Sequence, residues 1–183
     1  MSIDFNRYYW LNDNLSSAPK TVQECVSLGR LNTTEIPGPK SNPEILKLAA
    51  EAGVSNIYKN DDVAWCAVAA TVVCLRAGKT VGFTGYYRLR ARSFLQFGKP
   101  VTEPMFGDVI VFGRDGGGHV GFYIGEDNAY FHVAGGNQSN QFNIIRIAKN
   151  RAIGYRRPFY KIQPASVRKV FLKADGEVSV NEK

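Results

Sequence analysis

Residues 61–78 read DDVAWCAVAATVVCLRAG, and this stretch decides the fold. Its apolar residues continue nearly all round the turns of a helix, which is typical of a helix buried on every side. Asp61 or Asp62 is a suitable N-terminal cap, and Gly78 is a suitable C-terminal stop. We therefore expect the central buried helix of the protein here, with Cys66 in or near its first turn.

Beyond residue 104 the chain changes to short β-type runs separated by turn residues. These runs are GDVIVFG (107–113), HVGFYIG (119–125), AYFHVAGG (129–136), FNIIRIA (142–148) and AIGYRRP (152–158). Tight turns between them predict an antiparallel sheet of about five strands. Because the helical patterns precede the sheet, the fold class is α+β, with N-terminal helices packed on a C-terminal sheet.

The segments outside this frame are less regular. Residues 1–35 predict an irregular N-terminal arm with at most one short helix, around residues 21–28. PEILKLAAEAG (43–53) and YYRLRARSFLQFG (86–98) each predict a helix, the second with its arginines on a solvated face. Residues 161–183 carry mixed charge and are interpreted as an appendage.

Composition indicates one globular domain with an affinity for polyanions. The chain has 183 residues, 44% of them hydrophobic, and a formal net charge of +7. Nucleic acid, anionic lipid and bacterial envelope polymers are all compatible with that charge. The sequence contains no motif of a nucleic-acid-binding module, so nucleic acid is the least favoured of these partners.

Targeting and redox signals are few. No run approaches the roughly 18 apolar residues of a membrane span, and the N-terminus lacks the pattern of a secretory signal, so we expect synthesis in a cytoplasm. The three cysteines have no metal-like spacing, and neither a metal nor a cofactor is expected.

Cysteine chemistry is the best candidate activity. Cys66 lies where backbone N–H groups and the helix dipole stabilise a thiolate, whereas Cys25 and Cys74 are interpreted as buried apolar residues. A nucleophilic thiol needs an imidazole, and the chain offers His119 and His132. His119 opens a strand after a glycine-rich loop and is the preferred base, while His132 is interpreted as a satisfied sheet residue.

A third group should orient the imidazole, and the turn GGNQSN (135–140) supplies candidates. Asn137 is the first choice and Gln138 the second, with Gln138 also a weak candidate for substrate binding. Trp65 is either a sugar-stacking residue or a packing residue, and packing is preferred. Asp108 is interpreted as a turn residue that hydrogen-bonds its own backbone.

Five of these blocks in this order resemble the CHAP and NlpC/P60 cell-wall hydrolases of phages and bacteria. The blocks are IPGPKSNPEILKLAAEAG, DDVAWCAVAATVVCLRAG, ARSFLQFGKPVTEPMFGDVIVFGR, GHVGFYIG and GGNQSNQFNI. The resemblance implies a papain-like catalytic domain over residues 36–160, with Cys66 as nucleophile and His119 as base. Many CHAP members have a glutamate near the third position, where this chain has Gly135 and Gly136.

That family cleaves amide bonds of peptidoglycan without a metal, as endopeptidases or as N-acetylmuramoyl-L-alanine amidases. The resemblance therefore implies a peptidoglycan hydrolase, such as a free phage lysin or one carried in the virion with tail or baseplate proteins. Two alternatives remain open from the sequence. One is a structural tail component that keeps the fold, and the other is an acyltransferase or transglutaminase that uses the same thiol.

Overall fold

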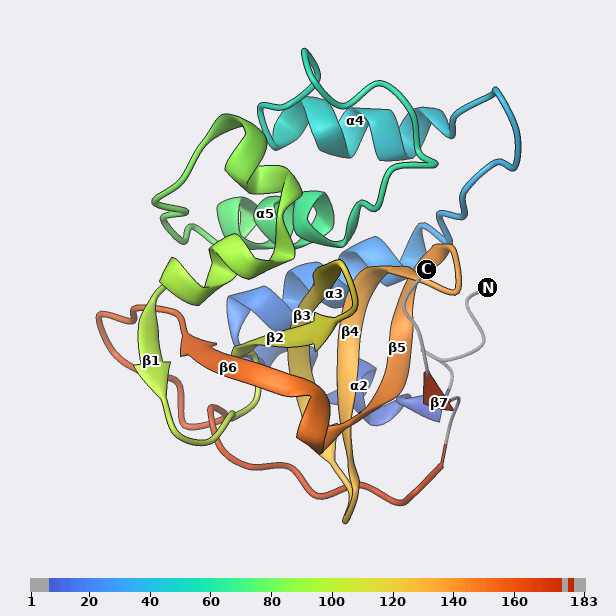
Figure 1. Cartoon of the computed structure of the whole chain (residues 1–183). Coiled ribbons are helices and arrows are strands. Elements are labelled where there is room, and N and C mark those ends of the chain that lie inside the picture. The colour runs from blue at the N-terminus through green and yellow to red at the C-terminus, as the bar shows by residue number, and fades with distance from the viewer. Residues whose placement is uncertain (1–6, 176–177, 180–183) are drawn as a thin grey trace.

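The computed structural model describes residues 7–175 and 178–179 of the chain (Figure 1). The helices that it describes are α2 (Trp10–Asp13), α3 (Lys20–Arg30), α4 (Pro43–Glu51) and α5 (Cys66–Arg76), with the 3₁₀ turns η1 (Leu15–Ser17), η2 (Gly85–Leu89), η3 (Ala91–Gln96) and η4 (Lys149–Arg151). The strands are β1 (Lys99–Val101), β2 (Val109–Arg114), β3 (Gly117–Glu126), β4 (Tyr130–Gln138), β5 (Gln141–Ala148), β6 (Ala152–Arg157) and β7 (Val178–Ser179).

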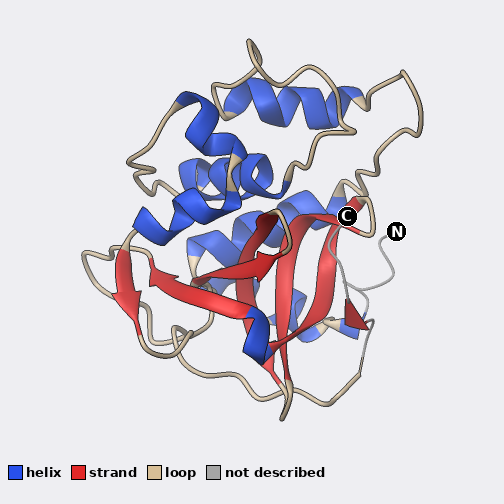
Figure 2. Cartoon of the chain, in the orientation of Figure 1, coloured by secondary structure: helices blue, strands red, loops and turns tan. Residues whose placement is uncertain are grey.

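The strands form one mostly antiparallel sheet, and the expected α+β class is confirmed (Figure 2). The strand order is β1-β6-β2-β3-β4-β5-β7, and β7 pairs with β5 in parallel. The five expected strands are β2 to β6, and the sheet has seven within the described residues. β1 and β7 are three and two residues long, too short to give a two-residue alternation in the sequence.

The sheet is buried on both faces, which explains its apolar strands. α5 packs against β3 and β4, and both α3 and α4 contact α5. Val109 and Val111 of β2 belong to the core beneath these helices. The alternate residues Ile110 and Phe112 join a smaller apolar cluster with residues of β3, β4 and β5. β3 thus lies between two apolar layers, with α5 packed on one side.

The central helix begins later than its sequence suggests. α5 starts at Cys66, and neither of the expected caps, Asp61 and Asp62, reaches it. Buried Asp61 instead accepts hydrogen bonds from the backbone N–H groups of Ile36 and Asn42, at 3.2 and 2.7 Å. The Asp61 carboxylate is therefore used to satisfy two backbone N–H groups of the preceding loop and does not cap the helix. Cys66 is consequently the first residue of the helix.

The segment 86–98 was expected to be one helix, and this expectation is wrong. It forms η2 and η3, separated by Arg90 in an extended conformation (φ −111°, ψ 115°). η3 buries Phe94 in contact with Phe83 and Phe97, whereas η2 buries none of its residues. Packing of Phe94 therefore prevails over the helical pattern.

Both terminal segments are more ordered than the sequence suggests. The N-terminal arm contains α2, η1 and the 11-residue α3 rather than one short helix. Part of the predicted appendage runs along the sheet, where the N–H groups of Glu126 and Leu172 donate to the carbonyl oxygens of Val170 and Glu126, respectively, both at 2.8 Å. No helix in the described part of the chain is long and apolar enough to cross a membrane.

Candidate active site

His119 and Gln138 are joined by a buried hydrogen bond. His119 stands near the start of β3 and Gln138 is the last residue of β4, and both side chains are almost completely buried. Nε2 of His119 lies 2.9 Å from Oε1 of Gln138. The imidazole also packs against Phe112, with ring centroids 6.2 Å apart. The hydrogen bond to Gln138 and the packing against Phe112 both help to hold the ring in place.

The contacts of Gln138 define which nitrogen of His119 carries the proton. The Gln138 amide nitrogen donates to the carbonyl oxygens of Val133 and Asn143, at 3.1 and 2.8 Å. A flipped amide would face two acceptors with an oxygen, so this orientation is fixed by the network. Oε1 then accepts a hydrogen bond from the N–H at Nε2 of His119. The neutral imidazole keeps its lone pair on Nδ1, which is the atom suited to act as a base.

Asn137 was the first choice for the residue that orients the imidazole, but the structure places Gln138 in contact with the ring instead. Asn137 is buried but has a left-handed backbone, with φ of 57°, at a register shift between Gly135 and Gln138. Such a bulge inserts a residue and re-aims the side chains that follow it. Gln138, the second choice from the sequence, consequently contacts the imidazole in place of Asn137.

Cys66 lines a cleft of about 420 Å³ at the N-terminus of α5. Gly118 lines the same cleft, and the buried His119 is the next residue along β3. The candidate nucleophile and the strand that carries the candidate base thus meet at one cleft. Backbone N–H groups of the first helical turn point toward the helix N-terminus, where they favour a thiolate and a developing oxyanion.

Gly136 permits this approach of helix and sheet. A Cβ atom at residue 136 would lie 2.7 Å from Cβ of Ala69 and 2.7 Å from the ring of Trp65. Only a glycine fits between β4 and the first turn of α5 at this distance.

Trp65 is a structural residue rather than a sugar-binding one. Its side chain is fully buried, and its indole N–H donates to Oε1 of Glu35 at 2.8 Å. The ring is therefore closed to a substrate, and its weak assignment to substrate binding is wrong. The preferred alternative, packing beneath the helix, agrees with the structure.

The remaining cysteines differ from Cys66 in their surroundings. Cys25 and Cys74 are fully buried in the apolar core, and burial raises the pKa of both thiols well above the ordinary value. A high pKa keeps a thiol protonated and unreactive. Cys66 is the cysteine with access to a cleft.

The second histidine belongs to a separate buried cluster. His132 contacts Oδ2 of Asp127 through Nε2, at 3.1 Å, and the hydroxyl of Tyr8 through Nδ1. Arg146 donates to the same Asp127 oxygen at 2.8 Å. His132 is thus a satisfied sheet residue, as its sequence context indicates.

Asp108 has the structural role expected from its turn. It accepts a hydrogen bond from the backbone N–H of Met105 and a second from Nη2 of Arg157, both at 2.8 Å. Burial raises the pKa of this carboxyl group, although both contacts oppose the change. Asp108 lies outside the lining of the Cys66 cleft.

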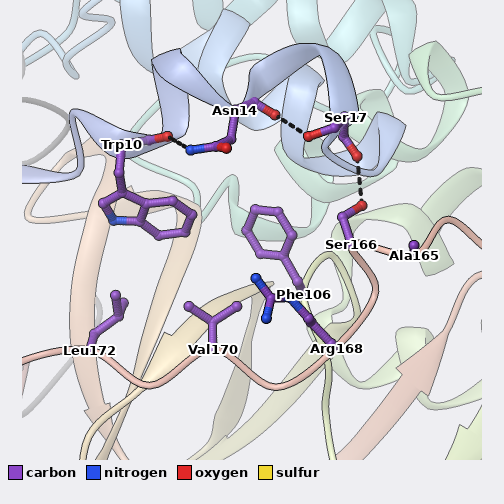
Figure 3. A pocket seen from close by; sticks show the side chains of 9 residues that line it. All are labelled: Trp10, Asn14, Ser17, Phe106, Ala165, Ser166, Arg168, Val170 and Leu172. Atoms are coloured by element: carbon purple, nitrogen blue, oxygen red, sulfur yellow. Dashed lines mark hydrogen bonds between the residues drawn. The ribbon is translucent and has the colours of Figure 1, made fainter.

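A larger cavity of about 590 Å³ lies elsewhere, between the N-terminal helical turns and residues 165–172 (Figure 3). Trp10, Phe106, Val170 and Leu172 give it an apolar lining, and Ser166 closes one end through a 2.6 Å hydrogen bond to the carbonyl oxygen of Ser17. It contains neither a cysteine nor a histidine. Size alone therefore does not identify the candidate active site.

The Cys66 cleft has one feature that was not expected from the sequence. Arg90, Arg92 and Arg114 all line it, and Arg90 and Arg92 are exposed, as expected for their segment. Only the packing of the β2–β3 hairpin against η3 brings Arg114 to the other two. No signal in the separate segments indicated this convergence.

Comparisons with protein-family models, curated proteins and solved structures give no match for this chain. The described residues also contain no group of three His, Cys, Asp or Glu side chains that could hold a metal ion.

Proposed function

We propose that this protein is a papain-like cysteine hydrolase that cleaves an amide bond of bacterial peptidoglycan. The observation that carries the proposal is the buried hydrogen bond between His119 and Gln138, because His119 directly follows Gly118, which lines the same cleft as Cys66. A thiol at a helix N-terminus, an imidazole and an amide that orients it are the parts of a cysteine protease triad.

The chemistry follows from these roles. His119 accepts the thiol proton at Nδ1, and the Cys66 thiolate attacks the amide carbonyl carbon. The carbon–nitrogen bond then breaks as His119 returns its proton to the leaving amine. Water, deprotonated by His119, attacks the resulting thioester, which releases the carboxylic acid and regenerates the thiol.

The substrate class is supported by the sequence motifs rather than by the chemistry of the triad. The W-C, G-D-V-I-V-F, G-H-V-G and G-G-N-Q-S-N blocks resemble those of CHAP and NlpC/P60 enzymes that act on peptidoglycan. The net charge of +7 suits a protein that works on anionic envelope polymers. A phage lysin, free or carried in the virion, is the form of the proposal that these motifs favour.

The proposal is tested by digesting purified peptidoglycan of several chemotypes and analysing the released fragments by mass spectrometry. Wild type is expected to release fragments, whereas Cys66→Ala and His119→Gln are expected to release none. Cys74→Ala, which removes a buried thiol of the same helix, should retain the activity and serves as the matched control.

Fragment masses also distinguish the alternatives. New free amine and carboxyl ends indicate hydrolysis and identify the bond, whereas a new amide in their place indicates acyl transfer. If folded wild type releases nothing from any chemotype, the proposal is wrong and a structural role becomes the better interpretation.

A further inference from the structure

The cleft beside Cys66 has a positively charged lining. Arg90, Arg92 and Arg114 contribute to it, and among the residues that the structure describes no aspartate or glutamate lines it. Three guanidinium groups around one candidate nucleophile produce a local positive potential, which attracts an anionic substrate but not a neutral one.

Two of these arginines converge just before the base. Nε of Arg92 donates to the carbonyl oxygen of Gly117 at 2.9 Å. Arg114 faces Gly117 across the β2–β3 hairpin, and a Cβ at residue 117 would lie 3.5 Å from Nε of Arg114. The Arg92 stem also packs close to Gly118, with Cγ 3.2 Å from a Cβ placed there. Both arginine side chains thus lie beside Gly117 or Gly118, the two residues that precede His119 in β3.

The rest of the lining leaves room for an extended peptide. Gly116, Gly117 and Gly118 line the cleft and contribute no side chains to it. Arg90 lies near Tyr86, with Cζ 6.0 Å from the ring centroid. Arg90 and Arg92 are exposed, so solvent reaches their side chains, and Arg114 is half-buried in the same lining.

We propose that this cleft selects substrates that carry a free carboxylate next to the scissile amide, and that Arg92 and Arg114 are the specificity-determining residues. The inference rests on the proposed hydrolase function and specifies its substrate. A planar guanidinium donates two parallel hydrogen bonds to a carboxylate, whereas a primary amide offers one acceptor and no charge. Peptidoglycan peptides with free carboxylates should therefore be cut in preference to those whose carboxylates are amidated.

The test compares one soluble peptidoglycan peptide in two forms, with free carboxylates and with the same carboxylates amidated. Cleavage is measured with wild type, Arg92→Gln, Arg114→Gln and the control Arg168→Gln, which removes an exposed arginine outside the cleft. Binding of both peptides is measured separately with the same arginine changes in a Cys66→Ala background, so that affinity is known independently of hydrolysis.

Wild type should cleave the free form with a kcat/KM about three- to tenfold above that of the amidated form, and Cys66→Ala should bind it more tightly by a similar factor. Arg92→Gln and Arg114→Gln should abolish this preference through KM, and Arg168→Gln should keep it. Arg92→Lys retains the charge without the planar fork, so it should recover only part of the preference.

Equal cleavage and equal binding of the two forms would overturn the carboxylate inference while leaving the hydrolase proposal intact. Absence of cleavage, with arginine-dependent preference retained in binding, would support the carboxylate site and refute hydrolysis. If the arginine changes instead slow alkylation of Cys66 by neutral iodoacetamide and leave the peptide preference unchanged, the arginines serve the thiolate and the inference is wrong.

Discussion

Gly136 of β4 lies against Trp65, so close that a Cβ atom at residue 136 would come within 2.7 Å of the indole ring. Trp65 is the residue that precedes α5, so this contact fixes where the first turn of the helix, and with it Cys66, meets the sheet. The position of the candidate nucleophile therefore depends on the absence of one side chain.

Gly136→Ala is expected to destabilise the protein by about 1–3 kcal/mol, because the added methyl group overpacks the helix–sheet contact. Activity should fall as well, since Cys66 moves with the helix end. Urea unfolding and peptide cleavage measure the two effects. Gly82→Ala is the matched control, because a Cβ at that exposed position meets nothing within 4 Å. Equal stability of the two variants would contradict the close contact.

Gln138→Ala should lower kcat by about 10²-fold, because the imidazole loses the group that fixes its tautomer and orientation. Asn137→Gly should have a much smaller effect, since Asn137 does not hold the ring and glycine tolerates its positive φ. Melting temperatures of both variants separate lost orientation from lost folding. A larger kcat loss in Asn137→Gly than in Gln138→Ala would show that the orienting residue is misassigned.

In the native protein Cys66 should react with iodoacetamide while Cys25 and Cys74 do not. Both of the latter are fully buried with raised pKa values, whereas Cys66 lines a cleft. Intact-mass measurement should show one label per native chain and three in denaturant. Cys66→Ser should take up none before unfolding, and a native label on Cys74 would contradict the described packing.

The His132–Asp127 cluster should make stability depend on pH. Burial lowers the pKa of His132 below its ordinary 6.5, so the unfolded chain binds the proton more tightly than the folded one. Stability is then expected to be complete above 6.5 and to fall as the pH decreases from that value toward the folded pKa. His132→Gln should lack this step in a series of thermal unfolding curves, and unchanged pH dependence in that variant would contradict the assignment.

Asp127 should cause a second loss of stability at lower pH. Burial acts to raise its pKa, but hydrogen bonds from the backbone N–H of Ala129 and from Arg146 prevail and lower it to about 2. Its contribution is present above the ordinary value of 3.8 and is lost as the pH falls toward 2. Asp127→Asn should remove this acid step, and at pH 7 it should cost about 3 kcal/mol because Arg146 stays buried without a charge partner. Urea unfolding at pH 3 and pH 7 measures both effects, and an acid step that persists in the variant would exclude Asp127 as its source.

The sequence by itself determined the α+β class, the central helix that carries Cys66 and the assignment of His132 and Asp108 to structural roles. These features follow from local patterns: the apolar run of the helix, the short apolar β-type runs and the turn residues between them. The same local signals identified Gln138 as a candidate to orient His119, although only as the second choice after Asn137.

Only the tertiary structure decided which residue contacts His119 and which arginines meet at the Cys66 cleft. The bulge at Asn137 shifts the register between β4 and β5, and Gln138 rather than Asn137 contacts the imidazole. The expected helix 86–98 is divided into two turns, and Arg92 lies beside the β2–β3 hairpin that carries Arg114. Such contacts join residues far apart in the chain, so no local pattern encodes them.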